Sequence, residues 1–197
     1  MKLYYAPGAC SLADHIALHE AGLTFDHVQV DLSTHHTAAG EDFYAINPKG
    51  YVPALVLDSG ETLTENIAIL DWIAQQAPAL VPGGALGRTH QLEALAFIST
   101  EIHKSFKPFF SGGGDDELAA ASKTITQRFG SIASAMQGDY LFGSQVSVAD
   151  AYLFVMTLWA SKMGVAVPAE LSAFIERMQG RAPVQTAMKH EGLIPAG

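Results

Sequence analysis

The sequence contains one cysteine, few basic residues and no long apolar run. A single cysteine, Cys10, excludes an internal disulfide and is typical of a reducing compartment. The chain has 11 Lys and Arg against 20 Asp and Glu, and this net charge of −9 argues against strong binding to nucleic acid or anionic lipid. The opening MKLYYAPGAC lacks the hydrophobic region of a signal peptide, and no apolar stretch reaches the roughly 20 residues that span a bilayer. We therefore expect a soluble, cytoplasmic protein whose partners are small molecules or proteins.

Hydrophobic residues make up 49% of the 197 residues, which is enough for packed cores. The first 77 residues carry a mixed pattern of strands and helices. The expected elements are a strand at KLYY, a helix from Cys10 or Ser11, a strand at DHVQVDL, a short helix near 41–46, a hairpin from ALVLD and ETLT, and a helix over 66–76. A small sheet covered by helices in this order predicts a thioredoxin-like domain over residues 1–77.

The remainder of the chain has a helical period throughout. The stretch APALVPGGALG holds two prolines and three glycines, so we place a linker at residues 78–88 and an all-helical domain at 89–197. Apolar spacing predicts one helix through Phe106 that Pro108 and the glycines at 112–114 terminate, and a second that ends near Met136. Ser147 and Asp150 resemble a capping box that opens the apolar helix VADAYLFVMTLWA. Two short helices, near 169–179 and 184–190, close the chain.

Cys10 follows a strand and a Pro-Gly turn and stands at the expected start of a helix. Free backbone N–H groups and the helix dipole stabilise a thiolate at such a position, so we expect a lowered pKa and a reactive thiol. The alternative is a buried cysteine that acts as a small apolar residue. Ala13 stands where a resolving cysteine would be needed, which excludes dithiol oxidoreductase chemistry.

Two further positions could bind a peptide-like ligand. The Val52-Pro53 bond precedes a predicted strand, and a cis isomer there would leave the Val52 backbone free to pair with an extended peptide, whereas a trans bond would be an ordinary strand entry. Glu65 and Asn66 stand where a hairpin meets a helix. Free N–H groups there suit a carboxylate and Glu65 suits an ammonium group, although helix capping alone also explains these residues.

The histidines His15 and His19 are one helical turn apart and could in principle bind a metal ion. The sequence shows no carboxylate or cysteine at ligand spacing beside them, and the HExxH pattern is absent. We therefore expect a solvated helix face and no metal site.

Several blocks of the sequence together resemble one family. They are YYAPGACSLADHIALHEAG, NPKGYVPALVLDSGETLTENIAIL, TEIHKSFKPFF, VADAYLF and APVQTAMKHEGL. In this order, and across almost the whole chain, they are similar to the bacterial beta-class glutathione transferases. The resemblance implies a thioredoxin-like glutathione-binding domain, a helical domain that contributes the electrophile pocket, and a homodimer.

The resemblance also implies roles for individual residues. Cys10 would lie beside the glutathione sulfur and form a mixed disulfide with it, and Val52 with Pro53 would offer backbone hydrogen bonds to the cysteinyl part. Glu65 and Asn66 would hold the γ-glutamyl group. From the helical domain, His103 would donate a hydrogen bond to the thiolate and Lys104 would pair with a carboxylate, although His103 also fits a core histidine. The expected electrophile pocket lies between the domains and is lined by Phe106, Phe109, Phe110 and Trp159.

Two residues depart from the family pattern. His35 stands where a lysine usually reaches the glycyl carboxylate, and a mostly neutral imidazole would hold that carboxylate less firmly at pH 7. Ala96 replaces a common asparagine. We expect weaker glutathione affinity from these changes rather than a different fold.

The function implied is nucleophilic conjugation of glutathione to small apolar electrophiles, a detoxification reaction that needs no metal ion. Thiol-disulfide exchange or peroxide reduction through Cys10 is a second activity that fits the same residues. The competing hypothesis is a non-catalytic dimer of the same fold that binds ligands or proteins.

Overall fold

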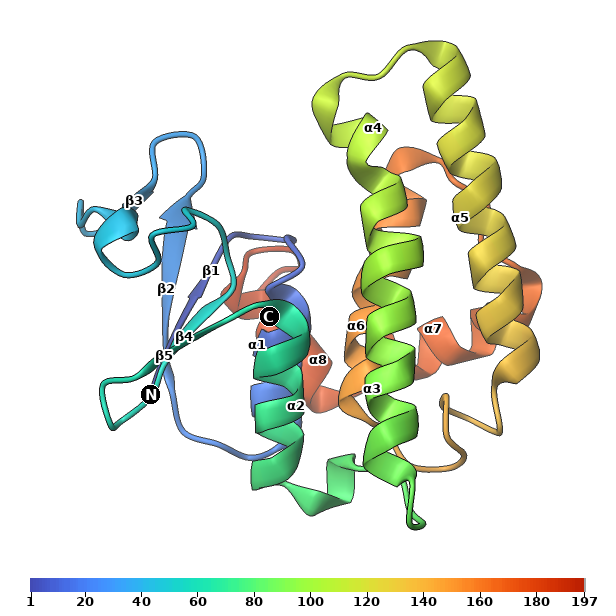
Figure 1. Cartoon of the computed structure of the whole chain (residues 1–197), viewed down its shortest axis with the longest axis horizontal. Coiled ribbons are helices and arrows are strands. Elements are labelled where there is room, and N and C mark those ends of the chain that lie inside the picture. Colours follow the sequence, from blue (N-terminus) through green and yellow to red (C-terminus); the bar gives the residue numbers. More distant parts are fainter. Residues whose placement is uncertain (197) are drawn as a thin grey trace. The chain divides into compact units, whose positions relative to one another are not determined.

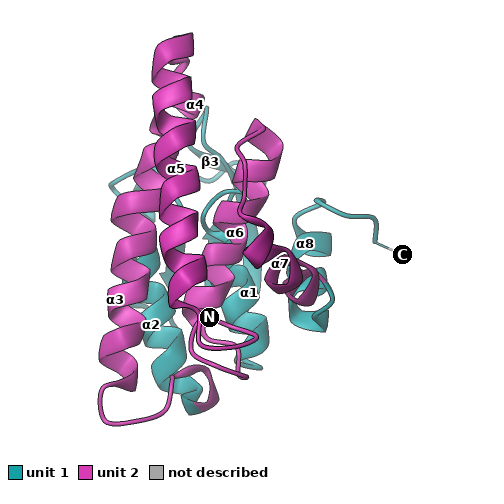
Figure 2. Cartoon of the chain, turned by 90° about the vertical axis from the view of Figure 1, so that its right-hand side faces the viewer, with its two compact units in different colours: residues 1–78, 180–197 teal, residues 79–179 magenta. Residues whose placement is uncertain are grey.

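The computed structural model describes residues 1–196, which divide into two compact units. Unit 1 comprises Met1–Pro78 together with the segment from Gly180 to the end of the described chain, and unit 2 comprises Ala79–Gln179 (Figure 2). The break at residue 78 falls at the start of the expected linker. The last helix of the chain, however, belongs to the mixed unit, because α8 packs against α1. No helix in residues 1–196 is long and apolar enough to cross a membrane.

Unit 1 is built on a five-stranded sheet in the order β3-β2-β1-β4-β5. Its strands are β1 (Lys2–Tyr5), β2 (Asp26–Asp31), β3 (His36–Thr37), β4 (Ala54–Val56) and β5 (Thr62–Thr64). β1 pairs parallel to β2 and antiparallel to β4, while β4 and β5 form the expected antiparallel hairpin. The parallel pair follows from the crossover through α1, which the strand-helix-strand order predicts.

The helices of unit 1 are α1 (Leu12–Glu20), α2 (Asn66–Gln76) and α8 (Ala182–His190), and the unit also contains the short 3₁₀ turn η1 (Phe43–Ala45). A second 3₁₀ turn, η2 (Pro78–Leu80), begins in unit 1 and ends in unit 2. Figure 1 shows α1, α2 and α8 together on one side of the sheet. α1 begins at Leu12, with Ser11 as its N-cap, rather than at Cys10 or Ser11 as expected. The expected short helix near 41–46 is the single turn η1, because Asp42 accepts a hydrogen bond from the Tyr44 N–H at 2.9 Å and starts a turn that ends at once.

Unit 2 consists of helices only. They are α3 (Gly87–Phe97), η3 (Ile98–Ile102), η4 (His103–Phe106), α4 (Lys107–Ser111), α5 (Asp115–Ala135), α6 (Val148–Met163), η5 (Ala169–Leu171) and α7 (Ser172–Gln179). α6 is the buried centre of this unit, as its apolar sequence predicts, and Tyr152 and Phe154 on it are fully buried. Each such side chain contributes on the order of 1.5–3 kcal/mol by leaving water.

The expected single helix through Phe106 is interrupted. η3 is a π-helical turn and η4 a 3₁₀ turn, so the hydrogen-bond register changes twice before α4 begins. The prediction that Pro108 terminates this helix is wrong. Pro108 lies in the first turn of α4, where its missing N–H costs nothing. Gly112 at φ +71°, the first of the glycines also expected to terminate the helix, ends it.

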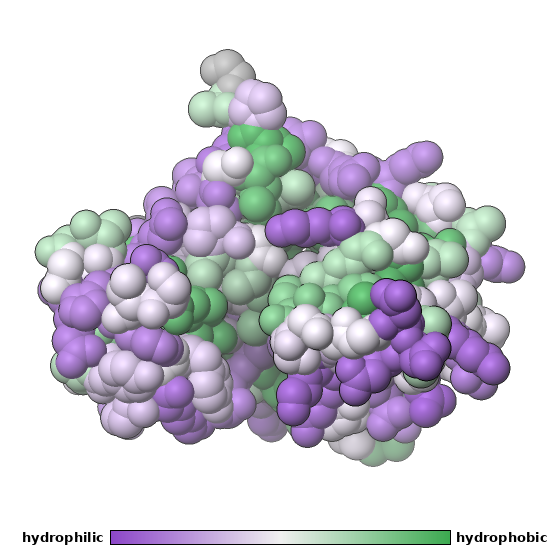
Figure 3. Space-filling view, turned by 90° about the horizontal axis from the view of Figure 1, so that it is seen from above, coloured by the Kyte–Doolittle hydropathy of each residue, from purple (hydrophilic) through white to green (hydrophobic). Residues whose placement is uncertain are grey.

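Figure 3 shows hydrophilic residues over much of one face of the molecule, with hydrophobic residues interspersed among them. Phe110, which is 60% exposed, and Leu86, which is 58% exposed, are the most exposed large apolar side chains among the described residues.

Candidate active site

Cys10 lies in the loop between β1 and α1, two residues before the helix begins. Its partly buried thiol donates a hydrogen bond to the Val52 carbonyl oxygen, with a sulfur-oxygen distance of 3.7 Å. Burial, and then the nearby Asp14 carboxyl, raise the pKa of the Cys10 thiol to about 12, although hydrogen bonds from Ser11, Cys10 and Asn66 favour the thiolate. The expected lowered pKa is therefore wrong. Desolvation outweighs the helix terminus, and the thiol is protonated at neutral pH.

The Val52-Pro53 peptide bond is cis, so the question that the sequence left open is answered. The bond lies immediately before β4, and Val52 is 5% exposed. The carbonyl oxygen of Val52 faces the Cys10 thiol. The Val52 carbonyl group, just before β4, and the thiol of Cys10 are therefore neighbours.

Glu65 precedes α2 with φ +71°, a left-handed conformation that a residue with a side chain rarely adopts. Its Oε1 accepts hydrogen bonds from the Tyr51 hydroxyl at 2.7 Å and from the Lys49 ammonium at 2.5 Å. These two donors, Lys49 first, hold the pKa of the Glu65 carboxyl below its usual value. Lys49 and Tyr51 thus keep the half-exposed Glu65 carboxylate ionised and fix its orientation. The strained backbone of Glu65 is of a kind that is concentrated at functional sites.

Asn66, the residue after Glu65, connects the start of α2 to the loop that contains Cys10. Its side-chain amide donates a hydrogen bond to the Cys10 carbonyl at 3.2 Å. The Asn66 Oδ1 atom is buried and has no hydrogen-bond partner among residues 1–196. An unsatisfied buried acceptor is costly, and a ligand N–H would satisfy it.

His35 stands at φ +55° between β2 and β3. Its Nδ1 lies 2.9 Å from the Gly50 carbonyl oxygen, and its ring is 4.6 Å from that of Tyr44. Because a carbonyl only accepts, Nδ1 carries the proton. Nδ1 is therefore already engaged within unit 1, and only Nε2 is available to a ligand.

His103, in unit 2, starts the η4 turn immediately after the π-helical turn. Its Nδ1 lies 2.6 Å from the Tyr152 hydroxyl, and its ring meets that of Trp159 edge to face at 4.9 Å. Burial lowers the pKa of His103 to about 4, so the ring is neutral at pH 7. A Tyr152 hydroxyl that donates to Nδ1 leaves Nε2–H as a hydrogen-bond donor. The neighbouring Lys104 is exposed.

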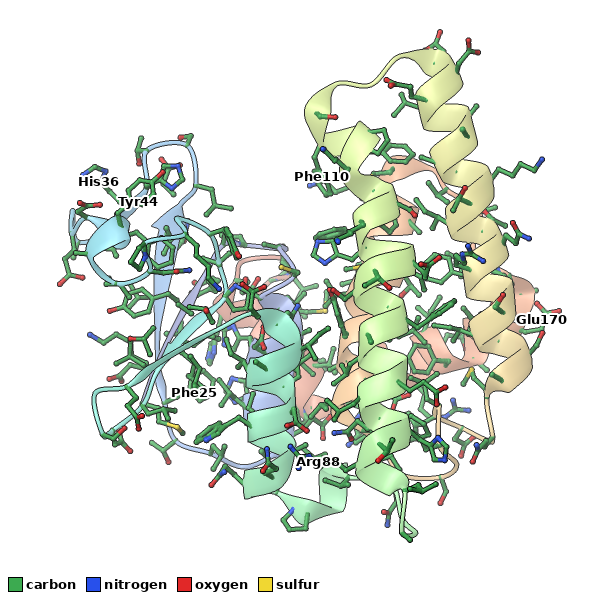
Figure 4. All side chains as sticks on the ribbon, in the orientation of Figure 1. Phe25, His36, Tyr44, Arg88, Phe110 and Glu170 are labelled. Carbon is green, nitrogen blue, oxygen red and sulfur yellow. The ribbon has the colours of Figure 1, made fainter. Side chains whose placement is uncertain are left out.

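The residues expected to line the electrophile pocket form one aromatic cluster in unit 2. Trp159 contacts Phe106 at 5.5 Å and Phe110 at 4.8 Å, measured between ring centroids, and Phe109 lies 6.1 Å from Phe106. Phe106 is fully buried, whereas Phe110 on α4, labelled in Figure 4, is largely exposed. A pocket of about 380 Å³ lies elsewhere in unit 2 against α3 and α5, and no predicted site residue lines it.

Three residues of this region escaped the sequence reasoning. Lys49 and Tyr51 orient Glu65, and the sequence block NPKGYVP that contains them indicates the family but not this contact. Asp14 is fully buried one helical turn after Cys10, and both of its carboxylate oxygens lack partners within residues 1–196. The i, i+4 spacing of Cys10 and Asp14 was the available signal for that pair.

The comparisons with known proteins decide the family. Residues 9–76 match the family model "Glutathione S-transferase, N-terminal domain". The chain is 39% identical to "Glutathione S-transferase GstA" of Escherichia coli O157:H7, over 98% of this chain and all of that protein. This protein belongs to the glutathione S-transferase family.

Solved structures place it more closely. A sphingomonad glutathione S-transferase complexed with glutathione is 46% identical with a TM-score of 0.91, and the bacterial beta-class enzyme of Sphingomonas chungbukensis is 46% identical with a TM-score of 0.90. Each comparison covers 98% of this chain and 100% of the other. The chain is a beta-class member of the family, and the resemblance drawn from its sequence blocks is confirmed. The fold is the thioredoxin-like domain followed by helices that the sequence predicts.

Proposed function

We propose that this glutathione transferase conjugates the glutathione thiolate to small apolar electrophiles, with the tripeptide bound along the Cys10, Val52 and Glu65 corner of unit 1. The observation that carries the proposal is the convergence of three unrelated chain segments there. An ionised Glu65, a buried unsatisfied Asn66 Oδ1 and the Val52 carbonyl provide the complements of an ammonium group and peptide N–H groups. Glutathione is the thiol substrate, and the reaction needs no metal ion.

The raised pKa of Cys10 bears on the mechanism. When the cysteinyl N–H of glutathione takes the Val52 carbonyl as acceptor, the Cys10 thiol is released beside the glutathione sulfur. A neutral thiol is a weak hydrogen-bond donor, and such a donor stabilises a neighbouring thiolate. We assign a second donor to the Nε2–H of His103 and a cation for the glycyl carboxylate to Lys104, following the family resemblance.

In the reaction itself, the glutathione thiolate attacks an electrophilic carbon of the second substrate. A carbon-sulfur bond forms while the bond to the leaving group breaks, and the leaving group departs with the electron pair. Phe109, Phe110 and Trp159 supply apolar surface for such an electrophile, while Phe106 supports Trp159 from the core.

Thiol-disulfide exchange through Cys10 is a slower, second activity in this proposal. The thiolate is the attacking species, and a pKa of about 12 leaves very little of it at neutral pH. Mass spectrometry after incubation with oxidised glutathione tests this activity. A reductant-sensitive adduct of one glutathione, absent from Cys10→Ala, supports it, and an unmodified wild type contradicts it.

Retention on immobilised glutathione, followed by a conjugation assay with a generic aryl halide, tests the main proposal. Retention with turnover is the expected result. Retention without turnover favours a non-catalytic ligand-binding protein, and no retention favours an interaction module. The proposal includes a homodimer and a cytoplasmic role in detoxification, in keeping with the acidic, cysteine-poor composition.

A further inference from the structure

Four histidines from three separate segments of the chain gather in unit 1, and none of them is among the residues assigned to glutathione. His15 and His19 come from α1, His27 from β2 and His190 from the end of α8. Ring centroids are 5.3 Å apart for His15 and His27, and 4.5 Å apart for the stacked pair His27 and His190. The expectation that His15 and His19 occupy a solvated helix face is wrong, because the β2 and α8 histidines cover that face and His15 is fully buried.

We propose that His15, His27 and His190 form a binding site for a transition-metal ion, with Zn²⁺ as the fitting ion and water as its fourth ligand. One ligand nitrogen from each of the three rings lies within 4.8 Å of the others. The His15 Nε2 and His190 Nδ1 atoms are 3.4 Å apart. Two nitrogens bound to one tetrahedral zinc at about 2.0–2.1 Å are separated by about 3.4 Å, so this pair already has the spacing of two ligands.

The carboxyl group of Glu191 contacts the ring of His15 on the side opposite the proposed metal ion. Glu191 places its Oε1 atom 3.0 Å from the Nδ1 of His15, and its own side chain is fully buried. In metal sites a ligating imidazole commonly donates its second N–H to such a carboxylate, which orients the ring toward the ion. Glu191 Oε2 is fixed in turn by the Gly8 N–H at 2.8 Å, so the supporting carboxylate is itself held in place.

The burial pattern suits an ion that arrives from solvent. His27 and His190 are exposed and can rotate to close the remaining distance to the buried His15. The His19 Nε2 atom is buried beside the cluster without a hydrogen-bond partner in residues 1–196, and its ring lies 5.3 Å from those of His15 and His190. Phe25, labelled in Figure 4, packs an apolar ring against His15 and His19.

The donor set selects the ion. Imidazole nitrogens suit Zn²⁺, Ni²⁺ and Cu²⁺, whereas Mg²⁺ and Ca²⁺ require oxygen ligands. An ion held by all three rings would tie the C-terminal helix α8 to α1 and β2. The proposed site therefore stabilises unit 1 and takes no part in the conjugation reaction.

Calorimetric titration of tag-free, chelator-treated protein with ZnCl₂, in the absence of glutathione, tests the site. The expected result is one Zn²⁺ per chain and a rise in melting temperature. His27→Ala and His190→Ala, which alter exposed side chains, should each weaken binding at least about 10-fold and abolish the rise. Co²⁺ in place of Zn²⁺ should give the visible absorption of a four-coordinate site in the wild type but not in His27→Ala or His190→Ala.

Matched controls come from two exposed histidines outside the cluster, His36 and His90. His36→Ala and His90→Ala should bind Zn²⁺ as the wild type does. Glu191→Gln should weaken binding about 10-fold while leaving the stoichiometry unchanged, because an amide oxygen is a weaker acceptor for the His15 N–H than a carboxyl that can ionise. Wild-type protein that binds no Zn²⁺ at about 100 µM free ion, far above the dissociation constants of structural zinc sites, overturns the proposal. Equal binding by wild type, His27→Ala and His190→Ala also overturns it.

Discussion

At the scale of single residues, the surroundings of a side chain decide its chemistry more than its place in a motif. Cys10 stands where a helix terminus would stabilise a thiolate, yet burial and Asp14 raise the pKa of its thiol to about 12. Glu65 behaves in the opposite way, because Lys49 and Tyr51 keep it ionised. The positions of both residues could be predicted from the sequence. Their protonation states could not, because Asp14, Lys49 and Tyr51 act through contacts that only the folded chain reveals.

The protonated state of Cys10 predicts slow alkylation. With a thiol pKa near 12 instead of about 8.5, the thiolate population at pH 7.5 falls by roughly three orders of magnitude. We expect iodoacetamide to react with the native protein at least about 100-fold more slowly than with the urea-unfolded chain, with the native rate still rising above pH 10. Since Cys10 is the single cysteine, mass spectrometry reports its modification directly. Equal rates in the native and unfolded states would show that the fold does not raise the pKa of the Cys10 thiol.

The ionised Glu65 predicts a charge-dependent loss of affinity. Glu65→Gln keeps the size of the side chain but removes the charge that faces an ammonium group, and a charge-assisted hydrogen bond of about 1.5–3 kcal/mol corresponds to roughly 10–100-fold in the glutathione dissociation constant. Glu61→Gln, an exposed change four residues earlier, is the matched control and should leave the constant unchanged. If both variants bind glutathione equally well, Glu65 does not hold the γ-glutamyl group.

At the scale of helices and strands, the sequence predicts most elements within a few residues. The bounds of β1 and α2 match, and the hairpin of β4 and β5 and the central α6 are present as expected. The strand β3 is too short for a period-2 pattern to be recognised. The π-helical turn before His103 was also missed, because its apolar spacing continues that of an ordinary helix. Such turns are frequent at functional sites.

The N-terminus of α6 depends on one buried carboxylate. Asp150 accepts hydrogen bonds from the Ser147 N–H at 2.8 Å, the Ser147 hydroxyl at 2.6 Å and the Leu141 N–H at 2.8 Å. Asp150→Ala leaves these donors unsatisfied and should lower the free energy of unfolding by about 2–4 kcal/mol. Urea denaturation at pH 7 measures this change. The exposed Asp26→Ala should change it by less than about 0.5 kcal/mol, and a similar small loss for Asp150→Ala would contradict the capping role.

At the scale of the whole molecule, the sequence predicts two compact parts but not which part the last helix joins. The helical period cannot reveal that the segment from Gly180 onward joins the mixed unit, because α8 has the same pattern as its neighbours in sequence. The histidine cluster could not be predicted either, because it joins segments that are distant in sequence. His15 and His190 are far apart in the chain, and no spacing rule connects them.

The family relationship also predicts the assembly state. We expect a homodimer, which sedimentation velocity would detect as a species near twice the chain mass of 20.9 kDa. A single species at the chain mass, at micromolar concentration, would contradict this prediction.

The proposed conjugation requires glutathione to bind at the site formed by Cys10, Val52 and Glu65. Calorimetric titration of the wild-type protein with reduced glutathione, beside Glu65→Gln and Glu61→Gln, tests it most directly. We predict saturable binding of one glutathione per chain that is weakened in Glu65→Gln alone. No detectable heat with the wild type, or equal binding by all three proteins, would contradict the proposed site.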